Sequence, residues 1–298
     1  MRSGERILVI LNPSSGVVSK DVAASYIFKK LTKSFDTVSL INSNSPEDGY
    51  NIAKKGLDSF DVITAFGGDG TINSIASALV GTDKTLGILP GGSGNGLIRN
   101  LKISLSWRSA LDTLINGKDK YIDIGKINNS YFFNVAGVGL DGFISKKFNL
   151  ESKTRGITPY IYYALKGYFE MPSFKVKINS DDIEFDEEIM LIAFANFQQY
   201  GGNAIIAPFA DPFDGYLDLC IIKNFKFVKS ALNLKRVFNG NIHKFPFYNT
   251  FKFKKAHIEA IDIKIPSTID GEYGGEDRKD YLIEVVPKSI KIRTPGNK

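Results

Sequence analysis

The stretch Phe66-Gly67-Gly68-Asp69-Gly70-Thr71-Ile72-Asn73 decides the fold, because it joins an apolar run of strand length to a segment with helical spacing. Three glycines within four residues let the backbone approach an anion closely and adopt positive φ angles. A helix that begins near Thr71 points its free N–H groups and the positive end of its dipole at the same place. We therefore predict a phosphate-binding turn made of Gly67, Gly68, Asp69, Gly70, Thr71, Ile72 and Asn73.

Asp69 is the unusual member of this turn, since a carboxylate repels a phosphate unless a cation or a donor hydroxyl lies between them. Asp69 would then hold Mg²⁺, or a water on that ion, or it would orient an attacking hydroxyl. The alternative is an ordinary strand-to-helix turn in which Asp69 is a helix cap.

Two further loops are expected at the same edge of the sheet. Leu89-Pro90-Gly91-Gly92-Ser93-Gly94-Asn95-Gly96 leaves the next strand, and Asn12-Pro13-Ser14-Ser15-Gly16 leaves the first strand, Ile7 to Leu11. In a parallel sheet these strand ends meet at one edge, where open α/β sheets bind their ligands. Neither loop is a Walker A motif or a dinucleotide fingerprint in its usual place.

The alternation of strands and helices covers residues 1–120, which predicts an α/β domain with a Rossmann-like, three-layer parallel sheet that binds a nucleotide. From residue 121 to 288 strand-like segments follow one another closely, including one at 250–263. We expect a β-rich, antiparallel, sandwich-like domain there, with the lipid-binding role described below. Residues 289–298 form a last strand that could return to the first domain.

The composition is that of an ordinary globular protein, with 298 residues, 43% hydrophobic and 23% charged. The single cysteine, Cys220, lies in an apolar run and is interpreted as a core residue. No apolar run approaches the roughly 18 residues that span a bilayer, so we expect a cytoplasmic protein, peripheral at the inner membrane face. A net charge of +6 favours an anionic surface, either nucleic acid or an acidic membrane leaflet.

Taken in order, the motifs resemble the diacylglycerol kinase catalytic-domain family, which includes bacterial soluble lipid kinases and the sphingosine and ceramide kinases. The resemblance covers nearly the whole chain, although the Gly-Gly-Asp-Gly turn alone is shared with NAD kinases and phosphofructokinases. It rests on these segments: Asn12-Pro13-x-Ser15-Gly16, Gly67 to Thr71, Pro90-x-Gly92-Ser93-Gly94-Asn95, Asn134-x-x-Gly137-x-Gly139-x-Asp141, Asn196 to Asp218 and Asp270-Gly271-Glu272.

The resemblance implies an NAD kinase/diacylglycerol kinase-like fold and an ATP- and Mg²⁺-dependent transfer of the γ-phosphoryl group to a diacylglycerol- or sphingoid-type lipid. The residues that it assigns to ATP are Asn12, Pro13, Ser14, Ser15, Gly16, Ser43, the turn at 67–73, Gly92, Ser93 and Asn95. The contact with adenosine stays open among Asn42, Ser43, Asn44 and Ser45.

The resemblance also places Glu272, with Asp270 beside it, near the acceptor hydroxyl as base or metal-linked acid. Asp69 competes for the role of base, and the sequence leaves both open. A metal site would use the Asp214 side chain and the backbone carbonyls of Asp211 and Tyr216 for Mg²⁺ or Ca²⁺, in a structural or a catalytic role. From the residues alone, ordinary turns explain both segments equally simply.

Two alternatives remain at this point. An NAD kinase or other small-molecule kinase would use the same glycine-rich turn, and a regulator would keep the fold without turnover. Gly96 stands where the family's glycerolipid kinases often have Asp, which favours a sphingoid acceptor.

Between Leu219 and Ile258, nine Lys or Arg residues and no acid alternate with aromatics. We predict a membrane-docking face here, with no nucleic-acid partner. The alternative is a β-rich domain whose aromatics form the core. The oligomeric state is unknown from sequence.

Overall fold

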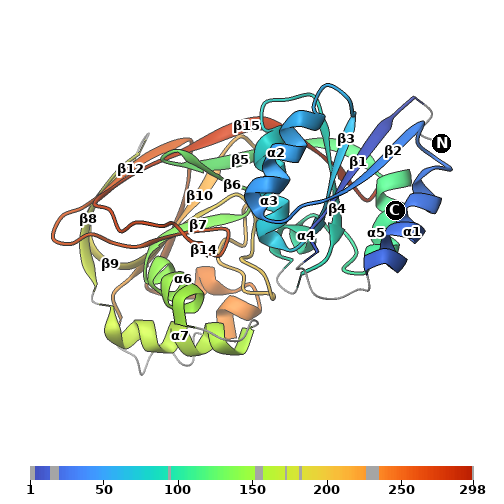
Figure 1. The fold of residues 1–298 in the computed structure, drawn as a ribbon. Helices are drawn as coiled ribbons and strands as arrows, with labels where there is room; N and C mark the ends of the chain where they lie inside the picture. Colours follow the sequence, from blue (N-terminus) through green and yellow to red (C-terminus); the bar gives the residue numbers. More distant parts are fainter. Residues whose placement is uncertain are drawn as a thin grey trace. The chain divides into compact units, whose positions relative to one another are not determined.

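The structure is a computed structural model that describes residues 4–13, 20–92, 95–151, 157–171, 173–180, 183–225 and 235–296. The chain forms two compact units, each described by itself (Figure 1). Unit 1 comprises Met1–Ile122 and Lys288–Lys298, and unit 2 comprises Asp123–Pro287. Two long strands, β5 (Lys118–Ile127) and β15 (Asp280–Thr294), carry the chain from one unit into the other.

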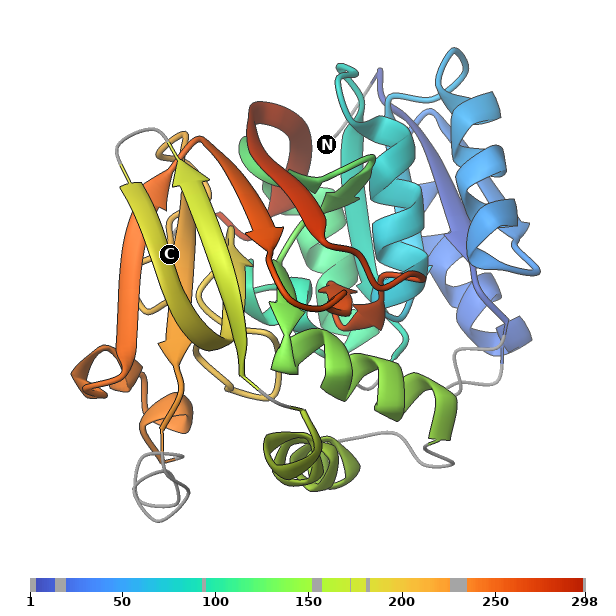
Figure 2. The same cartoon turned by 90° about the vertical axis from the view of Figure 1, so that its left-hand side faces the viewer.

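Unit 1 is a parallel sheet with helices on both faces. Its strands lie in the order β15-β4-β3-β1-β2, and every pair among them is parallel. Helices α2 and α3 cover one face, and α1 and α5 cover the other (Figures 1 and 2). The elements are β1 (Arg6–Leu11), α1 (Lys20–Leu31), β2 (Thr37–Asn42), α2 (Pro46–Gly56), β3 (Val62–Gly67), α3 (Asp69–Leu79), β4 (Thr85–Pro90), α4 (Gly96–Asn100) and α5 (Trp107–Asn116).

The strand order reverses at β1, which lies between β2 and β3. β3 and β4 are buried along their whole length, as expected for parallel strands covered on both faces. Their carboxyl ends and that of β1 therefore bring the predicted loops to the switch point of the sheet, where α/β proteins bind ligands.

Arg293 fixes the last strand within unit 1. Its guanidinium is buried and donates to both oxygens of Asp119, at 2.7 and 3.0 Å, and to the backbone oxygen of Leu114 at 3.0 Å. It also pairs with Glu5. Lys291 and Ile292 then pair in parallel with β4, so the chain's end completes the sheet of unit 1.

Unit 2 is antiparallel throughout its described strand pairs. Helices α6 and α7 lie together beside its strands (Figures 1 and 2). Its other elements are β6 (Ser130–Phe132), β7 (Val135–Gly139), α6 (Leu140–Glu151), α7 (Ile157–Glu170), β8 (Phe174–Ser180), β9 (Ile183–Ala195), β10 (Leu217–Lys223), a 3₁₀ turn (Ile242–Lys244), β11 (Tyr248–Phe253), β12 (Lys255–Ala260), β13 (Ser267–Ile269) and β14 (Glu272–Tyr273).

One strand prediction was wrong. The segment 250–263 forms two strands, because β11 pairs with β10 whereas β12 pairs with β8 and β15. The chain changes partners at Lys254, whose backbone oxygen accepts the N–H of Val285.

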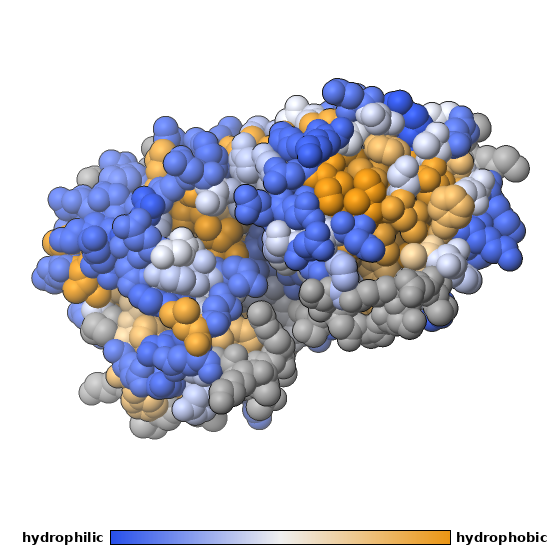
Figure 3. Space-filling view, viewed as in Figure 1, coloured by the Kyte–Doolittle hydropathy of each residue, from blue (hydrophilic) through white to orange (hydrophobic). Residues whose placement is uncertain are grey.

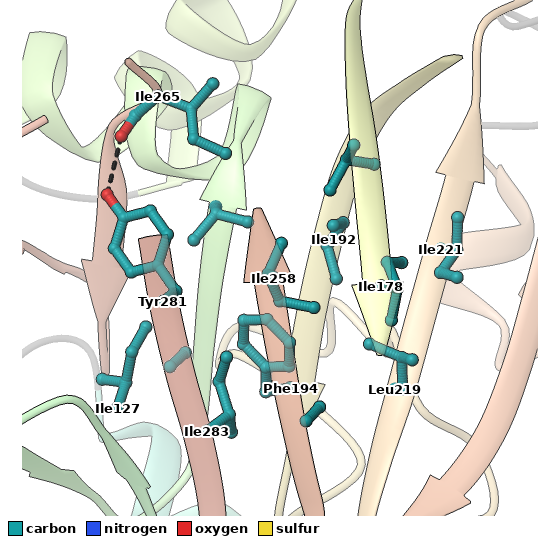
Figure 4. Packing of buried hydrophobic residues seen from close by; sticks show 14 of the residues in the cluster. Ile127, Ile178, Ile192, Phe194, Leu219, Ile221, Ile258, Ile265, Tyr281 and Ile283 are labelled. Carbon is teal, nitrogen blue, oxygen red and sulfur yellow. Dashed lines mark hydrogen bonds between the residues drawn. The ribbon is translucent and has the colours of Figure 1, made fainter. Parts of the chain in front are cut away.

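The core of unit 2 consists of inward-facing side chains from these strands (Figure 4). Ile178 of β8 lies opposite Ile258 of β12 in the strand register, and both are buried. Tyr281 is also buried, and its hydroxyl donates to the backbone oxygen of Ile265 at 2.6 Å. A buried phenol with a partner removes the cost of an unsatisfied polar group.

Hydrophilic side chains cover most of unit 2 on the face seen in Figure 3, while apolar side chains gather beside α2 and α3 of unit 1. Within the described ranges, no helix is both long enough and apolar enough to cross a bilayer.

Candidate functional site

The two glycine-rich turns of unit 1 touch each other. Gly67 and Pro90 are register partners at the ends of β3 and β4, and the Gly91 N–H donates to the Gly67 oxygen at 2.8 Å. A Cβ on Gly92 would lie 2.6 Å from the Cα of Gly68, a distance that real side chains do not tolerate. Glycine is therefore required at this contact, and the sequence pattern reflects packing as well as anion binding.

Asn12 ties the loop after β1 to the first turn. Its side-chain amide donates to the Thr71 hydroxyl at 2.8 Å, and its backbone N–H donates to the Phe66 oxygen at 3.0 Å. The Thr71 side chain packs over Gly67, where an added Cβ would lie 2.6 Å from the Thr71 Cβ. The structure therefore brings together the predicted residues Asn12, Gly67 and Thr71.

Asp69 caps a helix, but not the helix that it begins. Its two carboxylate oxygens accept the backbone N–H groups of Asn95 and Gly96, at 2.8 and 3.0 Å. These two residues open α4, so Asp69 links the first turn to the second and lies at the positive end of the α4 dipole. The helix-cap alternative thus describes Asp69 well, with a partner 26 residues away.

The start of α3 offers space for an anion. α3 begins at Asp69, two residues earlier than expected, and its N-cap, Gly68, makes no side-chain capping bond. A Cβ on Gly70 would meet nothing within 4 Å. Backbone N–H groups at such a helix start suit a phosphate.

The remaining residues of the predicted nucleotide site differ in exposure. Ile72 is fully buried and its N–H donates to the Gly68 oxygen, so it contributes packing within α3. Asn73 is half-buried. Asn95 has a left-handed backbone, with φ of 55°, and its amide donates to the Gly92 oxygen at 2.9 Å. Its buried Oδ1 has no hydrogen-bond partner among the described residues.

Ser43 is fully buried, and its hydroxyl donates to the Leu11 oxygen at 3.3 Å. A side-chain contact with adenosine from this loop would therefore fall to exposed Asn42, Asn44 or Ser45. Pro13 is half-buried at the end of the described first loop. Ser14, Ser15, Gly16 and Ser93 lie outside the described residues.

In unit 2, Asp270 and Gly271 form the two-residue turn between β13 and β14. Both have positive φ, at 50° and 90°, as an Asp-Gly type I′ turn requires. The Asp270 carboxylate accepts three backbone N–H groups, from Phe133 at 2.8 Å, Asn134 at 2.7 Å and Val135 at 3.1 Å. Asp270 therefore fastens the hairpin to the start of β7.

Glu272 follows directly and is exposed. The Asn149 amide, on α6, donates to the Glu272 Oε2 at 2.9 Å, which orients the carboxylate. The two acids of the Asp-Gly-Glu motif thus have different surroundings. Asp270 is bound to backbone and Glu272 is accessible to a ligand.

The Asn/Gly segment beside this hairpin is a buried polar network. The Asn134 amide donates to the oxygens of Gln199 and Tyr200, at 2.7 and 3.1 Å. The Tyr200 hydroxyl donates to buried Asp141 at 2.9 Å, and a Cβ on Gly137 would lie 2.2 Å from that carboxylate. These residues position β7 and α6, the elements around Glu272.

The predicted metal loop is held by hydrogen bonds. The Asp214 Oδ1 accepts the Tyr216 N–H at 3.0 Å, and its Oδ2 pairs with the Lys252 ammonium at 2.5 Å. The Asp211 oxygen accepts the Asp214 N–H at 3.4 Å. Among the described residues no three His, Cys, Asp or Glu side chains gather, so a metal here would need backbone carbonyls as well.

The basic aromatic stretch is mostly core where the structure describes it. Phe245, Tyr248 and Phe253 are buried, so these three cannot form the predicted membrane-docking face. Phe225 packs against Phe245, with ring centroids 5.1 Å apart. Phe227 lies outside the described residues. The core alternative is therefore correct for these buried aromatics.

Cys220 is also a core residue. It is fully buried, and burial raises the pKa of its thiol to about 12. A thiol in this state is a poor nucleophile, as predicted from the sequence.

The sequence prediction missed Asn149 and Asp123. Asn149 lies 123 residues from its partner Glu272, and no motif marks it. Asp123 is buried, and its carboxylate accepts the Gly215 N–H at 2.7 Å, which fixes the loop that carries Asp214. The one signal in the sequence is that Asp123 stands between apolar residues of a strand, where a charged side chain needs a partner.

Unit 1 thus offers a turn suited to phosphate at the end of a parallel strand, and unit 2 offers an exposed carboxylate. A family model described as "Diacylglycerol kinase catalytic domain" matches residues 6–127. Another, described as "YegS C-terminal NAD kinase beta sandwich-like domain", matches residues 134–294.

Individual relatives support the same family assignment. A diacylglycerol kinase from Bacillus subtilis (strain 168) is 32% identical over 283 residues, which cover 91% of each chain. The solved structure of a putative diacylglycerol kinase from Bacillus anthracis str. Sterne superposes with a TM-score of 0.79, at 24% identity over 97% of both chains. An NAD kinase from Archaeoglobus fulgidus, in complex with ATP, gives a TM-score of 0.55 at 14% identity over 97% of this chain and 93% of that chain.

The chain belongs to the diacylglycerol kinase family, a family of lipid kinases. The family, the enzyme class and the fold class predicted from the sequence are confirmed.

The different surroundings of the two hairpin acids predict different effects on stability. Asp270→Asn replaces an acceptor oxygen by an NH₂ group facing backbone donors, and we expect it to destabilise unit 2 by about 1–3 kcal/mol. Glu272→Gln, which removes the same charge from an exposed side chain, is the matched control and should leave the urea midpoint unchanged.

The buried and single Trp107 belongs to unit 1, so its fluorescence reports that unit, whereas far-UV circular dichroism reports both. Asp270→Asn should lower the circular dichroism midpoint more than the fluorescence midpoint. If the circular dichroism midpoint of Asp270→Asn equals that of Glu272→Gln, a structural role for Asp270 is contradicted.

Proposed function

We propose that this protein transfers the γ-phosphoryl group of ATP to the free hydroxyl of diacylglycerol, with Glu272 as the general base. The observation that carries this assignment is the contrast within the hairpin, because Asp270 is bound by three backbone N–H groups whereas Glu272 is exposed. A base must be able to reach the proton that it accepts, and Glu272 meets that condition.

The nucleotide phosphates would bind at the start of α3. The open space at Gly70, at the start of α3, and the contact between the glycine turns support this proposal. Phosphoryl transfer depends mainly on positioning and charge neutralisation, which such a rigid cradle can provide.

Asp69 would be a positioning residue and would not take part in the proton transfer. Since both of its oxygens accept backbone N–H groups of α4, we propose that it holds the second turn, with Asn95, against the first. This assignment removes Asp69 from the competition for the role of base.

Mg²⁺, when bound, would neutralise the charge that develops on the phosphoryl oxygens. The Asn95 Oδ1, a buried oxygen with no hydrogen-bond partner among the described residues, is a hard acceptor near the phosphate turn and fits such an ion.

A second cation, Mg²⁺ or Ca²⁺, is proposed at Asp214 and the backbone oxygens of Asp211 and Tyr216. The oxygen atoms fit a hard cation, but Lys252 must first release the Asp214 carboxylate. Added Mg²⁺ or Ca²⁺ should therefore raise the thermal midpoint of the protein and not that of Asp214→Asn, without reference to activity. Equal increases in both proteins would exclude Asp214 as a ligand.

The names of the relatives support a glycerolipid acceptor. We propose diacylglycerol in place of the sphingoid acceptor that Gly96 favours by resemblance. Peripheral contact with an anionic membrane at its inner, cytoplasmic face, where such a substrate lies, is part of the same proposal.

The test is phosphorylation of lipids in vesicles by the purified protein with Mg²⁺ and γ-labelled ATP. Vesicles containing diacylglycerol, monoacylglycerol, ceramide or sphingosine are compared, together with NAD in solution. We expect labelled diacylglycerol, and we expect Glu272→Gln to reduce the rate by at least a hundredfold, because general-base catalysis contributes about 10²–10⁴.

Binding of ATP, measured by calorimetry, should be unchanged in Glu272→Gln. Glu276→Gln, which removes an exposed acid four residues away, is the control and should keep full activity. Full activity in Glu272→Gln would exclude it as the base, and labelled NAD without labelled lipid would overturn the proposed acceptor.

A further inference from the structure

Helix α7 is apolar on two opposite sides. Its inner side packs closely on α6, where a Cβ on Gly167 would lie 2.8 Å from the Leu140 Cδ1 and 2.9 Å from the Phe143 Cδ1. Tyr163, one turn earlier, is buried on the same side. Packing on α6 therefore explains the apolar residues on the inner side of α7, but not those on its outer side.

The outer side of α7 presents three large side chains to solvent. Tyr162, Leu165 and Phe169 are 59%, 44% and 68% exposed, and their spacing of three and four residues forms one stripe along the helix. We call these three residues the α7 stripe. A helix packed on one side normally has polar residues on the other, so the solvent exposure of this apolar stripe calls for an explanation.

The neighbouring helix extends this apolar surface. Leu150 is 72% exposed at the end of α6, next to Glu151. Glu151 pairs with Lys166 of α7 at 3.5 Å, which brings the end of α6 beside the stripe. Figures 1 and 2 both show α7 at the edge of unit 2.

A basic segment adjoins the same helix. The Tyr168 hydroxyl of α7 donates to the Phe225 oxygen at 2.5 Å, and their rings lie 5.4 Å apart. Phe225 belongs to the segment from Leu219 to Ile258, which contains nine Lys or Arg residues and no acid. Phe225 contacts Phe245, and the preceding Lys244 is exposed.

We propose that the α7 stripe is the surface by which this kinase docks on an anionic lipid bilayer. Leu165 and Phe169 would enter the boundary between headgroups and acyl chains, with the Tyr162 hydroxyl at headgroup level. Exposed Lys244, next to the Phe245 that Phe225 contacts, complements the anionic headgroups. The inference deepens the proposed function, since it rests on an acceptor that resides in a membrane.

A lipid surface fits the stripe better than a second copy of the chain. Three side chains of this size, each about half exposed, offer roughly 300 Å², whereas a stable interface needs about 800 Å² from each partner. A bilayer has no such requirement, because a shallow apolar contact and electrostatic attraction together suffice for reversible binding.

The position of α7 also suits the proposed chemistry. α7 packs on α6, and α6 carries Asn149, whose amide donates to Glu272 at 2.9 Å. The docking surface and the proposed base are therefore connected through one pair of packed helices within unit 2.

The test compares the double variant Leu165→Ser/Phe169→Ser with Phe28→Ser/Leu105→Ser. The second pair is 48% and 44% exposed in unit 1 and is the matched control. Each protein is sedimented with phosphatidylcholine vesicles with and without phosphatidylglycerol. We expect the wild type and control to bind the phosphatidylglycerol vesicles, and the α7 variant to bind at least tenfold more weakly with an unchanged thermal midpoint.

Equal vesicle binding by the α7 variant and the wild type would overturn the proposal. So would wild-type binding that does not need phosphatidylglycerol, or a wild-type dimer in gel filtration that the α7 variant converts to monomer.

An activity measurement separates docking from the proposed function. The α7 variant should phosphorylate a water-soluble, short-chain diacylglycerol at the wild-type rate but lose at least tenfold on long-chain diacylglycerol in vesicles. If the wild type phosphorylates neither lipid, the proposed function fails, while vesicle sedimentation still decides whether the stripe binds a membrane. An equal loss on both lipids would contradict a role confined to docking.

Discussion

The contact between Gly68 and Gly92 is the constraint on which the site in unit 1 depends. The two backbone turns can approach this closely because Gly92 has no side chain, since a Cβ there would lie 2.6 Å from the Gly68 Cα. Asp69 then fixes the approach, since its carboxylate accepts the first two N–H groups at the start of α4. The two turns thus meet at the carboxyl ends of β3 and β4, where the start of α3 suits a phosphate.

Unit 2 uses the same physical device. The Asp270 carboxylate accepts three consecutive backbone N–H groups and so holds a tight hairpin against β7. A charged acceptor bound to several N–H groups is among the stronger hydrogen-bonded arrangements in proteins. Asp69 and Asp270 are thus bound to backbone N–H groups, whereas Glu272, which accepts the Asn149 amide, remains exposed to solvent.

Much of the fold follows from the sequence. Buried β-branched runs alternating with helical spacing predict the parallel sheet, and each glycine-rich turn lies at a strand end as expected. The positions of Asn12 and Thr71, 59 residues apart yet hydrogen-bonded, follow from the rule that parallel strands end at one edge.

The remaining features depend on tertiary contacts that leave no local pattern. Asp69 could be predicted to cap a helix, but its choice of α4 depends on how closely the turns meet. Asn149 and Glu272 are joined only through the packing of α6 beside the hairpin. Lysines interleaved with Phe245, Tyr248 and Phe253 suggested a surface, whereas these aromatics face inward.

The most direct measurement of the central claim, that Asp69 positions the turns while Glu272 does the chemistry, is single-turnover kinetics of Asp69→Asn. The account predicts weaker ATP binding, by tenfold or more, with a transfer rate at saturating ATP within a few-fold of the wild type. Asn keeps one acceptor oxygen but loses the second bond to α4. Unchanged ATP affinity with a transfer rate reduced a thousandfold would contradict it, because that pattern identifies Asp69 as the base.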